Sequence, residues 1–413
     1  PVPGYKIGIV FNVHRTGAAK MKYLLSLLCI LVVMVSGEAG CLELKDKVTV
    51  FGYFEPQFAF QEIDGDYQQL ASYKLRVDLE ASLSEKVTFQ ANFDYLTYHG
   101  RTTYFIFDFL SDEVTETLPP GSRDIYLYTF EDETFLDNAF IKIAFESFDV
   151  TIGKQQISAG VGYAWNPTDL FNQKSILDPS YEQPGHNAVR IDVPLGTSCS
   201  FMLLYNPEKD YEESGKYAKI KCHLGHFDLS IMGGERLWTT TDYELFSSVQ
   251  ERRKIVGGDL SGELLGLGIW LEGAYNDLEV TGHYTEALLG FDYTFESGLY
   301  LLNEFYYNEQ GKDDHEEFNF NDWMHYFSSE TKTVTQDQWF FYVSYPATDL
   351  LTVGTSVITS LDDQSLVLVP TINYNLDDNC DLSIFGNFYA GQEGKTYSPL
   401  LGQGGLIRLR YYF

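Results

Sequence analysis

The sequence predicts an all-β protein, a closed antiparallel up-and-down transmembrane β-barrel of about eighteen strands. Three observations predict this class. Apolar and polar residues alternate over long stretches, short and long connections alternate between these stretches, and the last eight residues alternate and are rich in aromatic side chains. A period of two places successive side chains on opposite faces of a sheet, which suits a wall between lipid and water.

The first residues are expected to lie outside the folded domain. A basic start at 21–22 and an apolar run at 24–35 are followed by small residues, and these are the parts of a secretory signal peptide. The expected organisation is an upstream extension at 1–20, a signal peptide at 21–39 and a single barrel domain at 40–413. Cys41 leaves a lipoprotein interpretation open, although Glu38 stands where that pattern prefers an aliphatic residue.

The composition excludes one class of partner. The formal net charge is −31, so we expect no binding to nucleic acid, which needs a basic surface. Aromatic residues make up 16% of the chain, with 30 Tyr and 30 Phe, and such abundance suits the aromatic belts at membrane interfaces. The mean hydropathy is slightly negative. Because the lipid-facing and wet sides of a barrel wall cancel in this mean, periodicity decides the class.

The clearest strand covers residues 69–84. Apolar side chains hold every second position from Ala71 to Leu83, and polar or charged side chains hold the positions between them. A strand averages about five or six residues in soluble proteins, whereas a tilted membrane strand needs about 9–11. Segments 48–61 and 87–98 repeat the pattern. These lengths favour a membrane barrel over the alternative, a soluble β-sandwich or propeller.

The connections alternate in length along the chain. Tight turns are expected near residues 84–86, 146–147, 195–197, 224–225, 265–266, 296–298, 347–348 and 377–378. Longer segments are expected at 99–133, 158–186, 236–251, 311–334 and 392–403, with shorter ones near 63–67, 207–214, 278–282 and 361–364. Short turns at one end and long loops at the other are typical of barrels with periplasmic turns and extracellular loops.

The last strand, residues 406–413, alternates to the final position. Its apolar face holds Ile407, Leu409, Tyr411 and Phe413. Its other face holds Arg408, Arg410 and Tyr412. Pairing with the first strand would close the barrel and remove an exposed edge. The alternative is the last strand of a soluble sandwich.

This ending resembles the C-terminal assembly signal of Gram-negative outer-membrane β-barrels of the porin superfamily, which has alternating apolar positions and a final Phe. The resemblance implies location in the outer membrane and contact with its lipid. It also implies recognition by the barrel-assembly machinery, with Leu409, Tyr411 and Phe413 as the signal residues. It leaves a homo-oligomer open.

The alternation also predicts which charges line the lumen. The basic candidates are Lys74, Arg76, Arg190, Arg408 and Arg410. The acidic candidates are Asp228, Asp259, Glu263, Glu272 and Asp292. If the two sets form opposite walls, they create a transverse field that orients polar solutes in the pore. The alternative is a wet lumen whose charges are segregated by chance.

Segment 158–186 is the candidate constriction loop. It is rich in Gly, Pro and aromatic residues, which would be costly to expose but are buried if the loop folds inward. Its candidate residues are Tyr163, Trp165, Asp169, Asp178 and Tyr181. The stretch from Gly153 to Phe171 resembles substrate-selective porins with a GRQ-type strand end before an NP-containing loop, although it lacks the Trp-Gly of some relatives. An extracellular cap is the alternative.

Two cysteines are expected to face each other across a hairpin. If the hairpin 198–224 turns near 210–211, Cys199 lies opposite Cys222, and both point to the lipid side. Opposed residues in a non-hydrogen-bonded antiparallel pair have Cα atoms about 4.5 Å apart, within the range that a disulfide accepts. A disulfide and a pair of neighbouring thiols both remain open.

The sequence contains no GxSxG, HExxH or phosphate-loop motif. The acidic run 313–317 is either a solvated loop tip or a site for a hard cation. We expect no enzyme, no cofactor and no metal site. The predicted function is a porin-like channel for passive diffusion of small polar solutes or ions. The alternatives are a loop-closed barrel that serves as adhesin, receptor or structural protein, and an outer-membrane enzyme.

Overall fold

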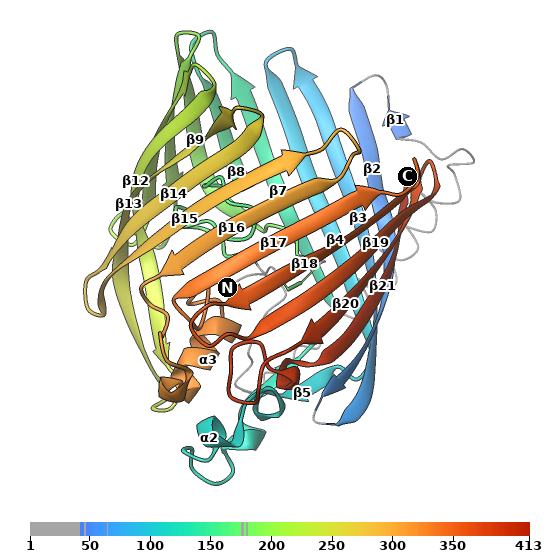
Figure 1. Ribbon diagram of the computed structural model, residues 1–413. Helices are drawn as coiled ribbons and strands as arrows, with labels where there is room; N and C mark the ends of the chain where they lie inside the picture. The colour runs from blue at the N-terminus through green and yellow to red at the C-terminus, as the bar shows by residue number, and fades with distance from the viewer. Residues whose placement is uncertain (1–41, 45–46, 64, 175–176, 179–180) are drawn as a thin grey trace, which may run out of the picture.

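The computed structural model describes residues 42–44, 47–63, 65–174, 177–178 and 181–413, which form a closed antiparallel β-barrel (Figure 1). The predicted extension at 1–20, the signal peptide at 21–39 and Cys41 lie outside these residues. Among the described helices, none is long and apolar enough to cross a membrane.

The predicted fold class and strand number are confirmed. Of the nineteen strands in the main sheet, eighteen form the closed wall, and the three-residue β1 (Leu42–Leu44) pairs with the start of β2. The strands of the wall are β2 (Val48–Ile63), β3 (Asp66–Ser84), β4 (Val87–Gly100), β7 (Glu133–Ala144), β8 (Asp149–Gln156), β9 (Gly185–Leu195), β10 (Cys199–Asn206), β11 (Gly215–Leu224), β12 (Phe227–Asp242), β13 (Ser247–Leu264), β14 (Leu267–Leu278), β15 (Gly282–Thr294), β16 (Tyr300–Asn308), β17 (Asp337–Pro346), β18 (Leu351–Ser360), β19 (Leu366–Asp377), β20 (Cys380–Tyr389) and β21 (Gln403–Tyr412).

The barrel closes where β21 pairs with β2. Gln57 lies opposite Arg408 in this antiparallel pair. Gly52 and Phe413 extend the pair by exchanging two backbone hydrogen bonds of 3.0 and 3.1 Å. A Cβ on Gly52 would lie 2.1 Å from the Arg76 carbonyl oxygen and 3.1 Å from the Phe413 ring. Glycine is therefore required for the close packing at the seam.

The wall has two different faces, as the alternation predicts. On β2, Phe54, Phe58 and Phe60 are exposed on the outside, while Tyr53 and Glu55, the two neighbours of Phe54, are buried on the inside. The exposed aromatic face is what a lipid-facing wall requires.

The eight predicted tight turns all connect neighbouring strands at one end of the barrel. The prediction of a long connection at 236–251 is wrong, because β12 runs to Asp242 and β13 begins at Ser247. The paired strands continue through polar residues such as Thr239 opposite Gln250. Threonine favours strands, so backbone pairing continues here although the apolar alternation stops.

The other end carries the long connections and the short helices (Figure 1). The β4–β7 connection contains β5 (Thr103–Phe105), η1 (Ile106–Phe109), α2 (Asp112–Thr115), η2 (Ser122–Asp124) and β6 (Leu127–Thr129). The β16–β17 connection contains η3 (His315–Glu317) and α3 (Phe320–Phe327), and η4 (Pro399–Leu401) precedes β21. Tyr126, Phe320 and Met324 are buried where the first two connections pack together. This apolar packing holds the loop elements in place at the barrel mouth.

Candidate functional site in the barrel lumen

The connection between β8 and β9, residues 157–184, is termed the inward loop because its described part folds into the barrel (Figure 1). Trp165 is 3% exposed, and its ring stacks on Tyr306 of β16 with centroids 5.0 Å apart. Leu170 packs in a second cluster with Tyr217 of β11. The loop therefore contacts widely separated strands across the lumen.

One end of the inward loop is bound to the wall by Glu272 of β14. This carboxylate accepts hydrogen bonds from the backbone N–H groups of Val161 (2.7 Å), Gly162 (3.2 Å) and Thr168 (2.6 Å). The Thr168 hydroxyl donates a further bond of 2.8 Å. Glu272 thus fixes the loop to the wall instead of presenting a charge to the pore.

Glu304 of β16 binds the next residues of the loop in the same way. It accepts hydrogen bonds from the backbone N–H groups of Tyr163 (2.6 Å), Ala164 (2.8 Å) and Trp165 (3.1 Å), and from the Trp270 indole (2.9 Å). Successive N–H groups form a nest that stabilises an anion. Both carboxylates are almost fully buried, so these donors provide the hydrogen bonds that buried charges need.

The glycines of this segment allow the close approach. Gly160 has φ +88°, and a Cβ there would lie 2.6 Å from a Glu272 carboxylate oxygen. A Cβ on Gly162 would lie 1.8 Å from the Trp165 carbonyl oxygen. Because only glycine tolerates both the positive φ and the contact, the glycine-rich sequence shapes the loop around the two carboxylates.

Glu182 binds the other end of the inward loop to the wall near the barrel seam. Its carboxylate lies 2.7 Å from Lys74 Nζ, 3.0 Å from Arg76 Nη1 and 3.5 Å from Arg410 Nη2. The Tyr53 hydroxyl also donates to it. Burial alone would raise the pKa of this carboxyl, but Lys74 and its other donors lower the pKa below its ordinary value. Glu182 is therefore ionised at neutral pH.

The predicted basic residues near the seam are brought together, and strand carboxylates accompany them. Arg410 forms an ion pair with buried Glu55, and Arg408 Nε lies 3.8 Å from the same carboxylate. Arg76 pairs with Asp78 at 3.0 Å, and Lys74 Nζ lies 3.6 Å from Asp94. Arg190 lies apart on β9, paired with Asp192 at 2.8 Å. The wall is therefore a network of ion pairs and not a row of isolated cations.

The predicted acidic residues are spread over several strands and have different partners. Asp259 pairs with Lys219 at 2.9 Å, and Asp292 accepts a hydrogen bond of 2.8 Å from the Tyr300 hydroxyl. Asp228 lies near the short turns and contacts Lys221 and His223. Glu263 is exposed beside the β13–β14 turn. Together with the anchoring role of Glu272, these positions do not form a single acidic surface.

A cavity of about 410 Å³ lies between the seam side of the wall and the inward loop. Its charged lining residues are Lys74, Glu55, Asp94, Glu133, Asp137, Asp178 and Glu182. Tyr98, Tyr128 and Tyr181 add aromatic surface. A space of this size, lined by apolar side chains and by several charged groups, suits a small polar solute.

The residues predicted for the constriction occupy different places. Trp165 is buried, whereas Tyr163 is 53% exposed and its ring stacks on Phe340. Asp169 is buried and accepts backbone hydrogen bonds within the loop. Asp178 and Tyr181 line the cavity. The loop thus presents Tyr163, Asp178 and Tyr181 to open space and uses Trp165 and Asp169 for its own packing.

Alternation along the strands does not identify every residue of this site. Glu55 and Asp94 occupy inward positions, so the period of two could have included them. Glu182 lies in an irregular loop, and no sequence period points to it. Its partners become apparent only from the folded loop.

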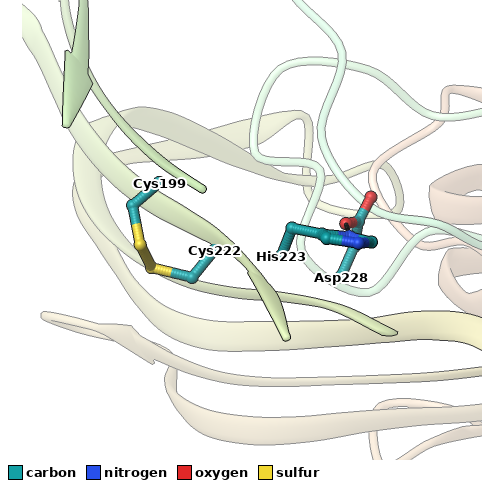
Figure 2. Close-up of a disulfide and its surroundings, with 4 residues drawn as sticks. All are labelled: Cys199, Cys222, His223 and Asp228. Carbon is teal, nitrogen blue, oxygen red and sulfur yellow. Dashed lines mark hydrogen bonds and ion pairs between the residues drawn. A yellow bond between two sulfur atoms is a disulfide. The ribbon is translucent and has the colours of Figure 1, made fainter. Parts of the chain in front are cut away.

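The cysteines pair in the register that the sequence predicts for a hairpin turning near 210–211. Cys199 lies opposite Cys222 in the β10–β11 ladder, and a disulfide joins them with the Cα atoms 4.1 Å apart. Figure 2 shows the disulfide on one side of the hairpin and the His223–Asp228 pair on the other. The bond therefore links neighbouring strands of the wall and takes no part in lining the lumen.

The closed barrel is similar in fold to barrels of solved structure. The fold is similar to Acinetobacter baumannii OccAB1, with a TM-score of 0.56 at 10% identity over 92% of this chain and 98% of that one. It is also similar to Pseudomonas aeruginosa OccK2 (OpdF) in complex with glucuronate, with a TM-score of 0.56 at 9% identity over 89% and 98% of the two chains. No family model and no curated protein matches the sequence. The likeness is thus one of fold.

Proposed function

We propose that the protein is an outer-membrane channel of a Gram-negative bacterium through which small polar solutes or ions diffuse passively. The observation that carries this proposal is the inward loop. Carboxylates hold both ends of this loop against the wall, and a cavity with charged lining residues lies beside it. Such a loop narrows the lumen, and the charges beside it select among solutes. The glucuronate complex of OccK2 supports the proposal, because a barrel of similar fold binds a small polar solute.

A second candidate is a barrel closed by its loops that serves as adhesin, receptor or structural protein. The apolar packing of the inward loop favours it, because Trp165 and Leu170 fill space between the loop and the wall. The two candidates differ in one respect that is easily measured. A channel lets solutes cross a membrane, and a closed barrel does not.

We expect liposomes that contain the purified protein to swell in isotonic solutions of small sugars and amino acids, and more slowly as solute size increases. The physical reason is that a narrow pore passes solutes according to size and charge. Light scattering measures the swelling rate, and protein-free liposomes and a large polysaccharide are the controls. If gel mobility shows that the barrels are folded and the liposomes still swell no faster than protein-free liposomes, the result would favour the closed barrel.

A further inference from the structure

We infer that Glu182 is the residue that sets the charge selectivity of the lumen. Its carboxylate belongs to the inward loop and occupies the place among the basic side chains at the barrel seam where a solute anion would otherwise bind. The inference rests on the proposed channel function. It predicts that the channel prefers cations to anions, although four of the predicted lumen residues at the seam are basic.

The geometry shows that three cations converge on this one carboxylate. Lys74, Arg76 and Arg410 come from β3 and β21, and their nitrogens lie 2.7, 3.0 and 3.5 Å from its oxygens. The side chains of these three cations are between 14 and 23% exposed, so salt screens the interactions less than it would at an open surface. With the Tyr53 hydroxyl, the cluster has the donors that bind a carboxylate strongly.

The charge balance at the seam depends on Glu182. Four cations lie in the cluster, namely Lys74, Arg76, Arg408 and Arg410. Four strand carboxylates lie beside them, namely Glu55, Asp78, Asp94 and Asp137. Glu182 is the fifth carboxylate, so its charge makes the cluster negative. The cavity that these residues line also includes Glu133 and Asp178, and a cation that enters therefore meets an attractive potential.

Glu182 differs from the strand carboxylates because it belongs to the loop. A solute carboxylate that reaches Lys74, Arg76 and Arg410 must compete with a carboxylate linked to the barrel by the chain. Such a linked group acts at an effective concentration on the order of millimolar. Dilute anions should therefore bind weakly in the native channel and more tightly once Glu182 is neutral.

The test is the reversal potential of single channels in planar bilayers under a KCl gradient, for the native protein and for Glu182→Gln. We expect the native channel to be cation-selective and E182Q to lower the cation-to-anion permeability ratio roughly tenfold, since one charge beside a narrow path has an effect of this order. Sodium glucuronate, added as a probe, should block E182Q at lower concentration than it blocks the native channel.

Two further variants serve as controls. Glu182→Asp keeps the charge and should retain the native selectivity, whereas Arg76→Gln with Arg410→Gln should increase the preference for cations. If E182Q does not assemble, this double variant tests the same cluster with Glu182 in place. An unchanged reversal potential in a conducting E182Q channel, or in the double variant, overturns the inference about Glu182 and leaves the proposed channel function standing. Absence of conductance in the folded native protein overturns the proposed channel function instead.

Discussion

Replacing Phe413 with Asp is expected to prevent formation of the closed barrel in most molecules. Phe413 and Gly52 exchange two backbone hydrogen bonds at the seam, and the ring packs over Gly52 on the outer face. The variant removes an apolar contribution of about 2–3 kcal/mol and places a charge on a surface that faces lipid. Because closure leaves no open edge in the sheet, weakening the final pair affects the whole barrel.

The measurement is the fraction of protein with heat-modifiable gel mobility after expression and isolation of membranes. Phe413→Tyr is the matched control, since it keeps the aromatic ring and should assemble as the native protein does. Normal yield and mobility of F413D would show that the seam does not depend on this side chain. The same result would weaken the interpretation of the last strand as an assembly signal.

Replacing both Glu272 and Glu304 with Gln is expected to release the inward loop while leaving the wall intact. Each carboxylate accepts hydrogen bonds at both oxygens, and the loop provides most of the donors. In glutamine an NH₂ group replaces one of the two oxygens, so backbone N–H groups face a donor instead of an acceptor. The lost hydrogen bonds weaken the attachment of the loop by on the order of 3 kcal/mol at each site. The loop should therefore detach from β14 and β16, and the lumen should widen.

The readouts are limited proteolysis of the inward loop and single-channel conductance, and both should increase. Glu263→Gln is the control because Glu263 is an exposed lumen-side carboxylate near the short turns. A double variant that keeps a protease-resistant loop and native conductance would show that the two carboxylates do not hold the constriction.

The sequence predicts the wall of this barrel well because the wall obeys one simple rule. Lipid on one side and water on the other impose a period of two, so residues from Ala71 to Leu83 reveal both the strand and its orientation. The same rule gives the Cys199–Cys222 register. It fails at 236–251, where β12 and β13 extend beyond the alternating region and only backbone pairing continues.

The site is harder to predict because its contacts join residues far apart in sequence. Alternation places Arg76 and Arg410 inside, but it does not show that Glu182 lies between them. It likewise places Glu272 inside without showing that the backbone of the inward loop surrounds it. These contacts depend on how an irregular loop of many residues packs in the lumen, and no periodic pattern encodes that path.

The central claim, that this barrel is a passive channel, is tested most directly by the conductance of the purified native protein in a planar lipid bilayer. A passive channel should give discrete upward steps of current as single barrels insert, with a reversal potential on the cation-selective side under a KCl gradient. Protein that shows heat-modifiable mobility and inserts into the bilayer without any current steps would contradict the account and identify a closed barrel.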